Sequence, residues 1–435
     1  MIEYRSIRIA LLGAGSVGAQ VADQILRHGD ELAARVGAGL ELVGVAVRNP
    51  DSARTADIPQ HLITTDAETL VRNADIVIEL MGGIEPARTL ILSAINSGAD
   101  VITANKALLA HHGPEIFDAA SQVGAQIFYE AAVAGAIPII RPLRESLAGD
   151  RVSRILGIVN GTTNFILDRI DTLGESMEAS LQMAQDLGYA EADPTADVEG
   201  FDAAQKAAIL ASLAFHTHVP VDQVYREGIT KVSLDQVQAA RKAGYVIKLL
   251  AIAERVALED GREGVSARVY PAMVPLTHPL AAVHGAYNAV FVEAEAAGSL
   301  MFYGAGAGGI QTASAVLGDL VTAARRHVIG GPGVVESAHA NMPIVPISAI
   351  STRYNITLEV TDAPGVLANI ASVFSQHGVS VESLEQKTVG VEVPTATLVI
   401  GTHVGIEADF AATVDALAAS PVVERVSGVL RVEGL

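Results

Sequence analysis

The chain has 435 residues, of which 50% are hydrophobic, and its formal net charge is −20 at pH 7. This length predicts two or three domains of about 150 residues each, and the acidic balance argues against nucleic acid as a partner, because binding a phosphate backbone requires clustered lysine and arginine. Since the chain contains no cysteine, disulfides, thiolate zinc sites and thiol nucleophiles are excluded, and with them an aldehyde dehydrogenase of the thiohemiacetal type.

The first 150 residues alternate short apolar strands with helices. Strands are expected at 7–12, 40–47, 75–80, 100–103 and 125–129, and helices at about 17–27, 86–97 and 113–123. This alternation is typical of a parallel, doubly wound α/β sheet. No apolar run reaches the roughly 18 residues that a membrane span needs, and the chain begins with a strand pattern instead of a signal peptide. We therefore expect a cytoplasmic protein with no membrane partner.

The pattern changes from about residue 150. A strand at 152–159, helices near 163–170, 176–187 and 200–214, and alternating strand patterns near 245–256, 265–274 and 288–296 predict an α+β domain. A long helix at about 308–328 is expected to return to the first domain. We therefore expect a nucleotide-binding domain at 1–150 and a catalytic domain at 151–329.

Glycine and proline, including Pro332, mark a linker over 330–350. The elements beyond it are a strand at 355–361, a helix at 364–377, strands at 379–386 and 395–403, a helix at 407–419 and a strand at 422–432. This order is βαββαβ, the ferredoxin-like unit. A third domain is therefore expected at 350–435.

The glycine-rich turn after the first strand predicts a dinucleotide site. Gly13 allows a tight turn, Gly15 lets a pyrophosphate approach the backbone, and Gly18 lets the helix pack closely on the strand. The amides of Ser16 and Val17 open the helix, whose N-terminus favours phosphate. The alternative is a plain glycine turn, but the strand–turn–helix context favours the nucleotide.

The end of the second strand bears on the choice of cofactor. Arg48 follows Val47 there, and the next acidic residue is Asp51. A guanidinium suits the 2′-phosphate of NADP, whereas an acidic residue would bind the ribose hydroxyl of NAD. The residues favour NADP. The alternative is that Arg48 is a solvated surface residue and that Asp51 serves NAD.

Two lysines are candidates for chemistry. Lys206 lies four residues after Asp202 in a predicted helix, so the two share one face, and their apolar neighbours favour partial burial. A lysine placed in this way could donate a proton to a carbonyl oxygen as the carbon receives hydride. Lys106 follows the strand at 100–103, at the edge of the sheet where ligands bind. The alternatives are an ordinary surface ion pair for Lys206 and a solvated lysine at a helix start for Lys106.

Seven segments together resemble homoserine dehydrogenases and span residues 1 to about 330. The segments are LLGAGSVG (11–18), MGGIEPA (81–87), TANKALLA (103–110), YEAAVAGAIPII (129–140), NGTTNFIL (160–167), LGYAEADPTADVEGFDAAQK (187–206) and YGAGAGGIQTASAV (303–316). The resemblance implies a reversible, NAD(P)-dependent reaction between L-homoserine and L-aspartate 4-semialdehyde, in the biosynthesis of threonine, methionine and isoleucine.

The resemblance also implies roles for particular side chains. Lys206 would be the acid/base, and Lys106 would be a second lysine near both the reacting hydroxyl and the cofactor. Glu191 would hold the substrate ammonium, Asp202 would also bind substrate, and Asp197 would support the site.

Further family features concern the cofactor and a cation. Gly188 and the run Gly304, Gly306 and Gly308 would close over the nicotinamide. A monovalent cation, Na⁺, maps onto Glu130 and the backbone carbonyls of Val133, Gly135 and Ile137. A carboxylate with several carbonyl oxygens suits a hard cation, and the alternative is a structural turn between strand and helix.

The tail from Asn355 to Leu435 resembles an ACT domain. Its ligand loop would lie at 362–367, and the effector-binding residues would be Asp362, Gly365, Val366 and Leu367. The implied effector is L-threonine, and the implied assembly is a homodimer or homotetramer. The alternative is an ACT domain that only dimerises, since a fold alone does not confer function.

Two other functions compete with this interpretation. The first is another nicotinamide enzyme of amino-acid metabolism. The second is a non-catalytic amino-acid sensor with a vestigial nucleotide-binding domain, against which the intact set of lysines and carboxylates argues.

Overall fold

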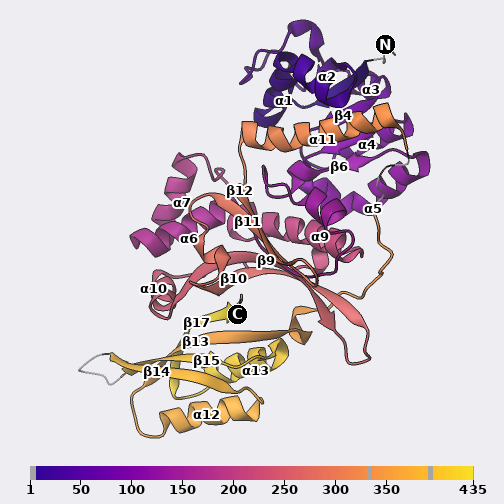
Figure 1. Cartoon of the computed structure of the whole chain (residues 1–435). Coiled ribbons are helices and arrows are strands. Elements are labelled where there is room, and N and C mark those ends of the chain that lie inside the picture. Colours follow the sequence, from indigo (N-terminus) through magenta and orange to yellow (C-terminus); the bar gives the residue numbers. More distant parts are fainter. Residues whose placement is uncertain (1–5, 332, 334–335, 390–394, 435) are drawn as a thin grey trace. The chain divides into compact units, whose positions relative to one another are not determined.

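The computed structural model describes residues 6–331, 333, 336–389 and 395–434, so Pro332 of the predicted linker lies outside the described residues. The chain divides into two compact units, each of which is described by itself (Figure 1). The first unit combines the chain up to Gly161 with 202–222 and 286–342. The second unit combines 162–201 and 223–285 with the chain from Pro343 onward. No helix among the described residues is both long enough and apolar enough to span a membrane.

The first unit contains the expected parallel sheet. Its strands are β1 (Ile7–Leu12), β2 (Leu40–Ala46), β3 (Ile63–Thr64), β4 (Ile76–Glu79), β5 (Asp100–Thr103) and β6 (Ile127–Phe128). Their order is β3-β2-β1-β4-β5-β6, and every neighbouring pair is parallel. This confirms the doubly wound Rossmann sheet. The two-residue β3 was not predicted, because so short a strand has no recognisable periodicity.

Helices flank this sheet. They are α1 (Ser16–Arg27), α2 (Gly29–Val36), α3 (Ala67–Arg72), α4 (Ala87–Asn96) and α5 (Lys106–Val123). Helix α5 begins at Lys106 and not near residue 113, because the side chain of Asn105 accepts a hydrogen bond from the amide of Leu108 at 3.1 Å and caps it. Lys106 is therefore the first residue of a helix that begins seven residues earlier than predicted.

Other elements complete the first unit. Strand β11 (Tyr287–Ala294) pairs antiparallel with both β7 (Val152–Ile158) and β12 (Gly298–Ala305), and α9 (Phe201–Phe215) belongs to the same unit from Asp202 onward. Helix α11 (Gly309–Ile329) lies beside α1 (Figure 1). Its apolar residues Ala313, Val316 and Leu320 join the core that holds Ile9 and Leu11 of β1.

The second unit begins with helices and a long hairpin. Its helices are α6 (Gly161–Leu173), α7 (Met177–Asp186), α8 (Thr195–Val198) and α10 (Leu234–Lys242). Strands β9 (Tyr245–Ala257) and β10 (Glu263–Pro275) form an antiparallel pair, and the short β8 (Tyr225–Arg226) runs parallel to β10.

The C-terminal part of the second unit is a four-stranded sheet with two helices. Its elements are β13 (Ser351–Thr361), α12 (Val366–Gln376), β14 (Val381–Val389), β15 (Thr395–Thr402), the short β16 (Gly405–Ile406), α13 (Glu407–Ala418) and β17 (Val423–Val432). The antiparallel order β17-β13-β15-β14 confirms the ferredoxin-like fold. Its core is closed by Ile356, Leu358, Ile370, Phe374 and Phe410.

Candidate active site

The carboxyl ends of the parallel strands meet at one edge of the first unit's sheet. Leu12 of β1 is in register with Ala46 of β2 and Glu79 of β4, and Glu79 is in register with Thr103 of β5. The turns that follow these residues therefore lie along the same edge, where open α/β sheets bind ligands.

The glycine turn has the geometry that a dinucleotide requires. Gly13 has φ +95°, and a Cβ there would lie 2.8 Å from the carbonyl oxygen of Leu80. A Cβ on Gly18 would overlap the carbonyl of Gly13, whereas a Cβ on Gly15 would meet no atom within 4 Å. Because no side chain caps α1 at Gly15, the first helical amides, including those of Ser16 and Val17, can bind a phosphate. These residues fit a nucleotide pyrophosphate.

The two residues that compete to select the cofactor are both exposed. Arg48 lies two residues beyond β2, and within the described chain no hydrogen bond or ion pair engages its guanidinium. Asp51 is also exposed, and its backbone amide bonds the side chain of Asn49 at 3.0 Å. Both side chains are exposed to solvent, so their positions do not decide between NADP and NAD, and NADP stays a prediction.

A buried carboxylate and an amide hold the loops around Lys106. Glu79 is fully buried and accepts hydrogen bonds from the amide of Met81 at 2.8 Å and the hydroxyl of Thr103 at 2.6 Å. The amide group of Asn105 donates to the carbonyl of Gly83 at 2.6 Å and caps α5. Neither Glu79 nor Asn105 is among the residues that the sequence predicts for the site. An asparagine before a helical pattern is a capping signal that could have identified Asn105.

A lysine–carboxylate cluster forms where α5 and α9 begin. The Lys206 ammonium lies 2.7 Å from Asp202 Oδ2, and the Lys106 ammonium lies 3.2 Å from Asp202 Oδ1. Lys206 also donates to the carbonyl of Val159 at 2.7 Å, and Asn160 donates to Asp202 Oδ2 at 2.9 Å. Three of the predicted site residues are therefore brought together. Asn160, part of the NGTTNFIL segment, joins them without having been predicted.

Electrostatics keeps the central carboxylate ionised. Burial by itself would raise the pKa of Asp202, but the two ammonium groups and the hydrogen bonds from Lys206 and Asn160 outweigh it and lower that pKa to about 2. The Lys206 side chain is 12% exposed, whereas that of Lys106 is 39% exposed. Lys206 is therefore better shielded from solvent than Lys106.

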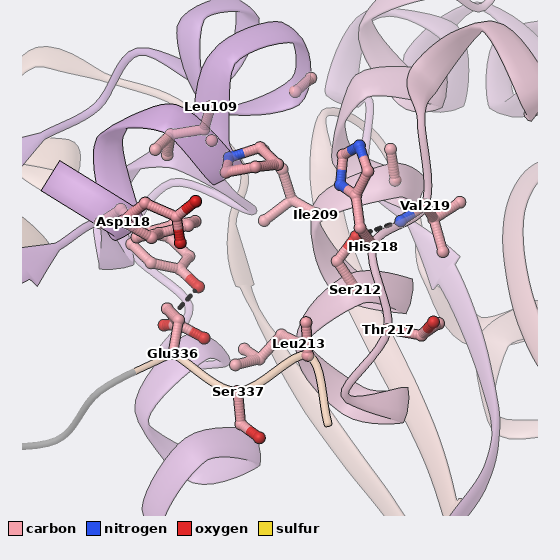
Figure 2. Close-up of a pocket in the computed structure, with 17 residues that line it drawn as sticks. Leu109, Asp118, Ile209, Ser212, Leu213, Thr217, His218, Val219, Glu336 and Ser337 are labelled. Atoms are coloured by element: carbon pink, nitrogen blue, oxygen red, sulfur yellow. Dashed lines mark hydrogen bonds between the residues drawn. The ribbon is translucent and has the colours of Figure 1, made fainter. Parts of the chain in front are cut away.

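A separate cavity of about 150 Å³ lies farther along the same two helices. Figure 2 shows apolar side chains around it, among them Leu109 of α5 and Ile209 and Leu213 of α9. The lysines and Asp202 do not line this cavity. The lysine–carboxylate cluster therefore lies at the starts of α5 and α9, and the apolar cavity lies between the later turns of the same two helices.

Three predicted residues belong to the second unit. Gly188 follows α7 with φ +74°, and Glu191 is exposed in the loop before α8, where Gln185 donates to its carbonyl at 3.1 Å. Asp197 is half-buried within α8. Their roles in substrate and cofactor binding stay predictions.

The predicted glycine run in the first unit passes the start of α1. Gly304 is in β12, and a Cβ on Gly306 would overlap the side chain of Asn288. Gly308 has φ +131° and immediately precedes α11. A Cβ on the next residue, Gly309, would lie 2.9 Å from the carbonyl oxygen of Ser16. The run is therefore close to the glycine turn.

The predicted cation site contains a carboxylate that is already engaged. Glu130 is buried, and its side chain accepts hydrogen bonds from the amides of Ile139 at 2.5 Å, Ile140 at 2.7 Å and Arg141 at 3.0 Å. A carboxylate that binds three amides has little capacity left for a cation. This leaves carbonyl oxygens, such as those of Val133, Gly135 and Ile137, as the donors in this turn.

The same region holds a carboxylate that should make stability depend on pH. Burial raises the pKa of Asp319 from 3.8 to about 7. Between about pH 4 and pH 7 the folded chain retains a proton that the unfolded chain has released, so this group costs stability as pH rises. Asp319→Asn stays neutral and can still accept the Glu130 amide, which Asp319 binds at 2.8 Å. Denaturant unfolding should therefore favour the variant at pH 8 relative to pH 5, by up to about 3 kcal/mol, because part of the cost is already present at pH 5.

A matched substitution checks this prediction. Asp66→Asn changes an exposed carboxylate in the same unit that caps α3. The free energy of unfolding of Asp66→Asn, relative to the parent, should not increase between pH 5 and pH 8. Equal differences at both pH values for Asp319→Asn would contradict the proposed ionisation.

The predicted effector loop joins β13 to α12. Gly365 has φ +92° and precedes the helix, and a Cβ there would meet no atom within 4 Å. Leu367 is 42% exposed, and Asp362 receives a hydrogen bond from Gln386 at 3.3 Å. Val366, in contrast, is buried in the core of this sheet. Effector binding by this loop stays a prediction.

Comparisons with known protein families match nearly the whole chain. The model described as homoserine dehydrogenase matches residues 138–321, and the model of the homoserine dehydrogenase NAD-binding domain matches residues 13–130. The ACT domain model matches residues 354–421.

Relatives and solved structures agree with these matches. The chain is 51% identical to the homoserine dehydrogenase of Corynebacterium glutamicum, over 98% of this chain and 96% of that protein. It is 53% identical to that of Mycobacterium tuberculosis strain H37Rv, over 99% of each. A homoserine dehydrogenase structure from Thiobacillus denitrificans superposes with a TM-score of 0.91 at 39% identity, covering 99% of this chain and 98% of that one. A hyperthermophilic archaeal homoserine dehydrogenase mutant in complex with NADPH matches 73% of this chain and 98% of its own, with a TM-score of 0.61 and 26% identity.

Proposed function

The chain belongs to the homoserine dehydrogenase family, and we propose that it interconverts L-homoserine and L-aspartate 4-semialdehyde with NADP and Lys206 as the acid/base. The observation that carries this proposal is the cluster in which Asp202 binds the ammonium groups of both Lys106 and Lys206. We assign nucleotide binding to residues 1–150, catalysis to 151–329 and regulation to 350–435.

The cofactor would be held by the glycine turn and the uncapped start of α1, through Gly15 and the amides that follow it. When bound, the nicotinamide supplies or accepts the hydride. The family resemblance implies that Gly188 and the run Gly304, Gly306 and Gly308 would close over the nicotinamide.

The lysines handle the proton. In the direction of reduction, the ammonium of Lys206 donates a proton to the oxygen of the aldehyde as its carbon becomes the alcohol carbon. In the direction of oxidation, the neutral amine takes the hydroxyl proton. Lys106 binds the same substrate oxygen, and Asp202 holds both amino groups near each other through its two carboxylate oxygens. Glu191 binds the substrate ammonium, and Asp197 supports that loop.

Cofactor choice should depend on Arg48. Its exposed guanidinium can bind the 2′-phosphate of NADP, which NAD lacks. Arg48→Ala should raise the KM for NADPH about tenfold while leaving the KM for NADH within about twofold, since a charge-assisted hydrogen bond contributes about 1.5 kcal/mol or more. Steady-state kinetics with each cofactor measures this. Arg54→Ala, a change to an arginine that bonds the backbone of Pro50 at 3.0 Å, is the matched control. An unchanged preference in Arg48→Ala would instead assign selection to another residue.

The activity itself is tested by following NADPH absorbance with aspartate semialdehyde as substrate. Rapid, substrate-dependent loss of absorbance supports the proposal, and homoserine with NADP should reverse it. Other 2-amino alcohols, tested in parallel, exclude a different nicotinamide enzyme of amino-acid metabolism. Absence of turnover with both cofactors would support the non-catalytic sensor instead.

Two further features belong to the same proposal. A monovalent cation, Na⁺, would bind the carbonyl oxygens of Val133, Gly135 and Ile137, near the engaged carboxylate of Glu130. L-threonine would bind at the loop around Gly365 and regulate a homodimer or homotetramer. The support for the first is the family resemblance, and the support for the second is the ACT domain match and the open space at Gly365.

A further inference from the structure

A short segment of the second unit, residues 225–230, binds the residues just before α9 through hydrogen bonds and close backbone contact. The amide of Ile229 donates to the carbonyl of Val198 at 2.8 Å, and the hydroxyl of Thr230 donates to the Glu199 carboxylate at 2.9 Å. Gly228 approaches so closely that a Cβ there would overlap the carbonyl of Val198. The backbones of the two segments are therefore in direct contact, and one cannot shift without the other.

Arg226 fixes the first residue of α9 itself. Its guanidinium donates to the carbonyl of Glu199 and lies 3.5 Å from the ring centroid of Phe201. Phe201 is 45% exposed, so the stacked guanidinium is a principal neighbour of its ring. Asp202, which binds the two catalytic lysines, is the next residue in the same helix. A shift of Arg226 would therefore displace Phe201, the residue immediately before Asp202.

The same segment is also tied to the regulatory sheet. Glu227 forms an ion pair with Arg431 of β17 at 2.8 Å. Arg431 is buried, binds Glu407 of its own domain at 2.9 Å, and lies 5.4 Å from the ring centroid of Tyr354 and 4.5 Å from that of Tyr270 in β10. Arg431 therefore contacts the segment in two ways, through the ion pair with Glu227 and through the ring of Tyr225, whose centroid is 5.4 Å away.

Open space beside this contact gives the segment room to move. Strands β10 and β17 are in register for only two residue pairs, Ala272 with Arg431 and Met273 with Val432. A cavity of about 660 Å³ is lined by residues of the 225–230 segment and by residues of β17. Because a tightly packed interior resists displacement, this cavity leaves the 225–230 segment room to follow the Glu227–Arg431 ion pair, while Glu433 separately links the end of the chain to Arg268 of β10 at 3.5 Å.

We propose that residues 225–230 are a coupling segment, through which β17 of the ACT domain sets the position of the α9 start. Arg226 is the positioning residue for Asp202, and Glu227 is the link to Arg431. The inference rests on the proposed function, because the effect is read at the lysine cluster.

Kinetics of three variants and their combination test the coupling segment. Arg226→Met should lower kcat/KM for homoserine at least tenfold while the Kd for NADPH stays within twofold, and Arg226→Lys should recover part of the loss. Glu227→Gln, which keeps its size but loses its charge, should lower kcat/KM about threefold or more. The double variant Arg226→Met/Glu227→Gln should be no worse than Arg226→Met alone, because both changes act through one segment.

Hydrogen exchange gives a second measurement that does not need turnover. In Glu227→Gln, the amides of residues 198–206 should exchange faster than in the parent protein. Glu382→Gln is the matched control, because it removes an exposed ion pair with Arg353 (3.0 Å) in the same domain and should change neither exchange nor kinetics.

Specific outcomes would overturn the proposal. If Glu227→Gln showed the kinetics and hydrogen exchange of the parent protein, Glu227 would not link the segment to β17. If the losses in kcat/KM multiplied in the double variant, Arg226 and Glu227 would act independently. A lower melting temperature with unchanged kinetic constants would indicate a purely structural role. An inactive parent protein would refute the proposed function instead, and the exchange experiment would still decide the coupling.

Discussion

Lys206→Ala is expected to lower the kcat of NADPH-dependent aspartate semialdehyde reduction by about 10²- to 10⁴-fold, the range typical of a positioned general acid. The Lys206 ammonium is 2.7 Å from Asp202, and its side chain is only 12% exposed. Alanine removes the proton donor and leaves Lys106, which is more exposed, as the remaining ammonium on Asp202. Initial rates at saturating NADPH measure the effect.

Binding and matched variants separate this role from a general loss of structure. The Kd for NADPH should stay nearly unchanged, because the glycine turn is built from other residues of the same unit. Lys242→Ala, at an exposed lysine in the last turn of α10, should behave like the parent protein. Near-normal turnover in Lys206→Ala would remove Lys206 from the acid/base role and would leave Lys106 as the candidate.

Gly15→Val is expected to raise the Kd for NADPH by about 100-fold or more, equivalent to about 2.7 kcal/mol. A Cβ at this position meets no protein atom within 4 Å, so the valine side chain projects into the space that the pyrophosphate would use. The fold should tolerate the change, and the variant should unfold at nearly the same denaturant concentration as the parent. Fluorescence titration with NADPH and denaturant unfolding measure the two quantities.

Gly18→Ala is the informative contrast, because its Cβ would overlap the carbonyl of Gly13. That variant should lose stability as well as cofactor affinity, since helix α1 must move away from β1. If Gly15→Val bound NADPH with parental affinity, the pyrophosphate could not lie over this turn, and the cofactor site would have to be placed elsewhere.

The two glycines show how much of the site local sequence can predict. The G-x-G-x-x-G spacing after an apolar strand implies a tight turn, an open approach and a close packing contact, and the structure assigns these properties to Gly13, Gly15 and Gly18 in that order. Sequence patterns missed what local periodicity does not encode. Strand β3 is too short to recognise, and the first two turns of α5 depend on the Asn105 cap.

The sequence by itself determined the Rossmann sheet, the βαββαβ tail and the pairing of Asp202 with Lys206, because each follows from spacing along a strand or one face of a helix. Only the tertiary structure decided that Lys106 binds the other oxygen of Asp202, that Asn160 joins them, and that the Glu130 carboxylate is engaged by backbone amides. Such contacts join residues far apart in the chain, and their distances are set by how whole helices and strands pack against one another, which no local pattern of residues specifies.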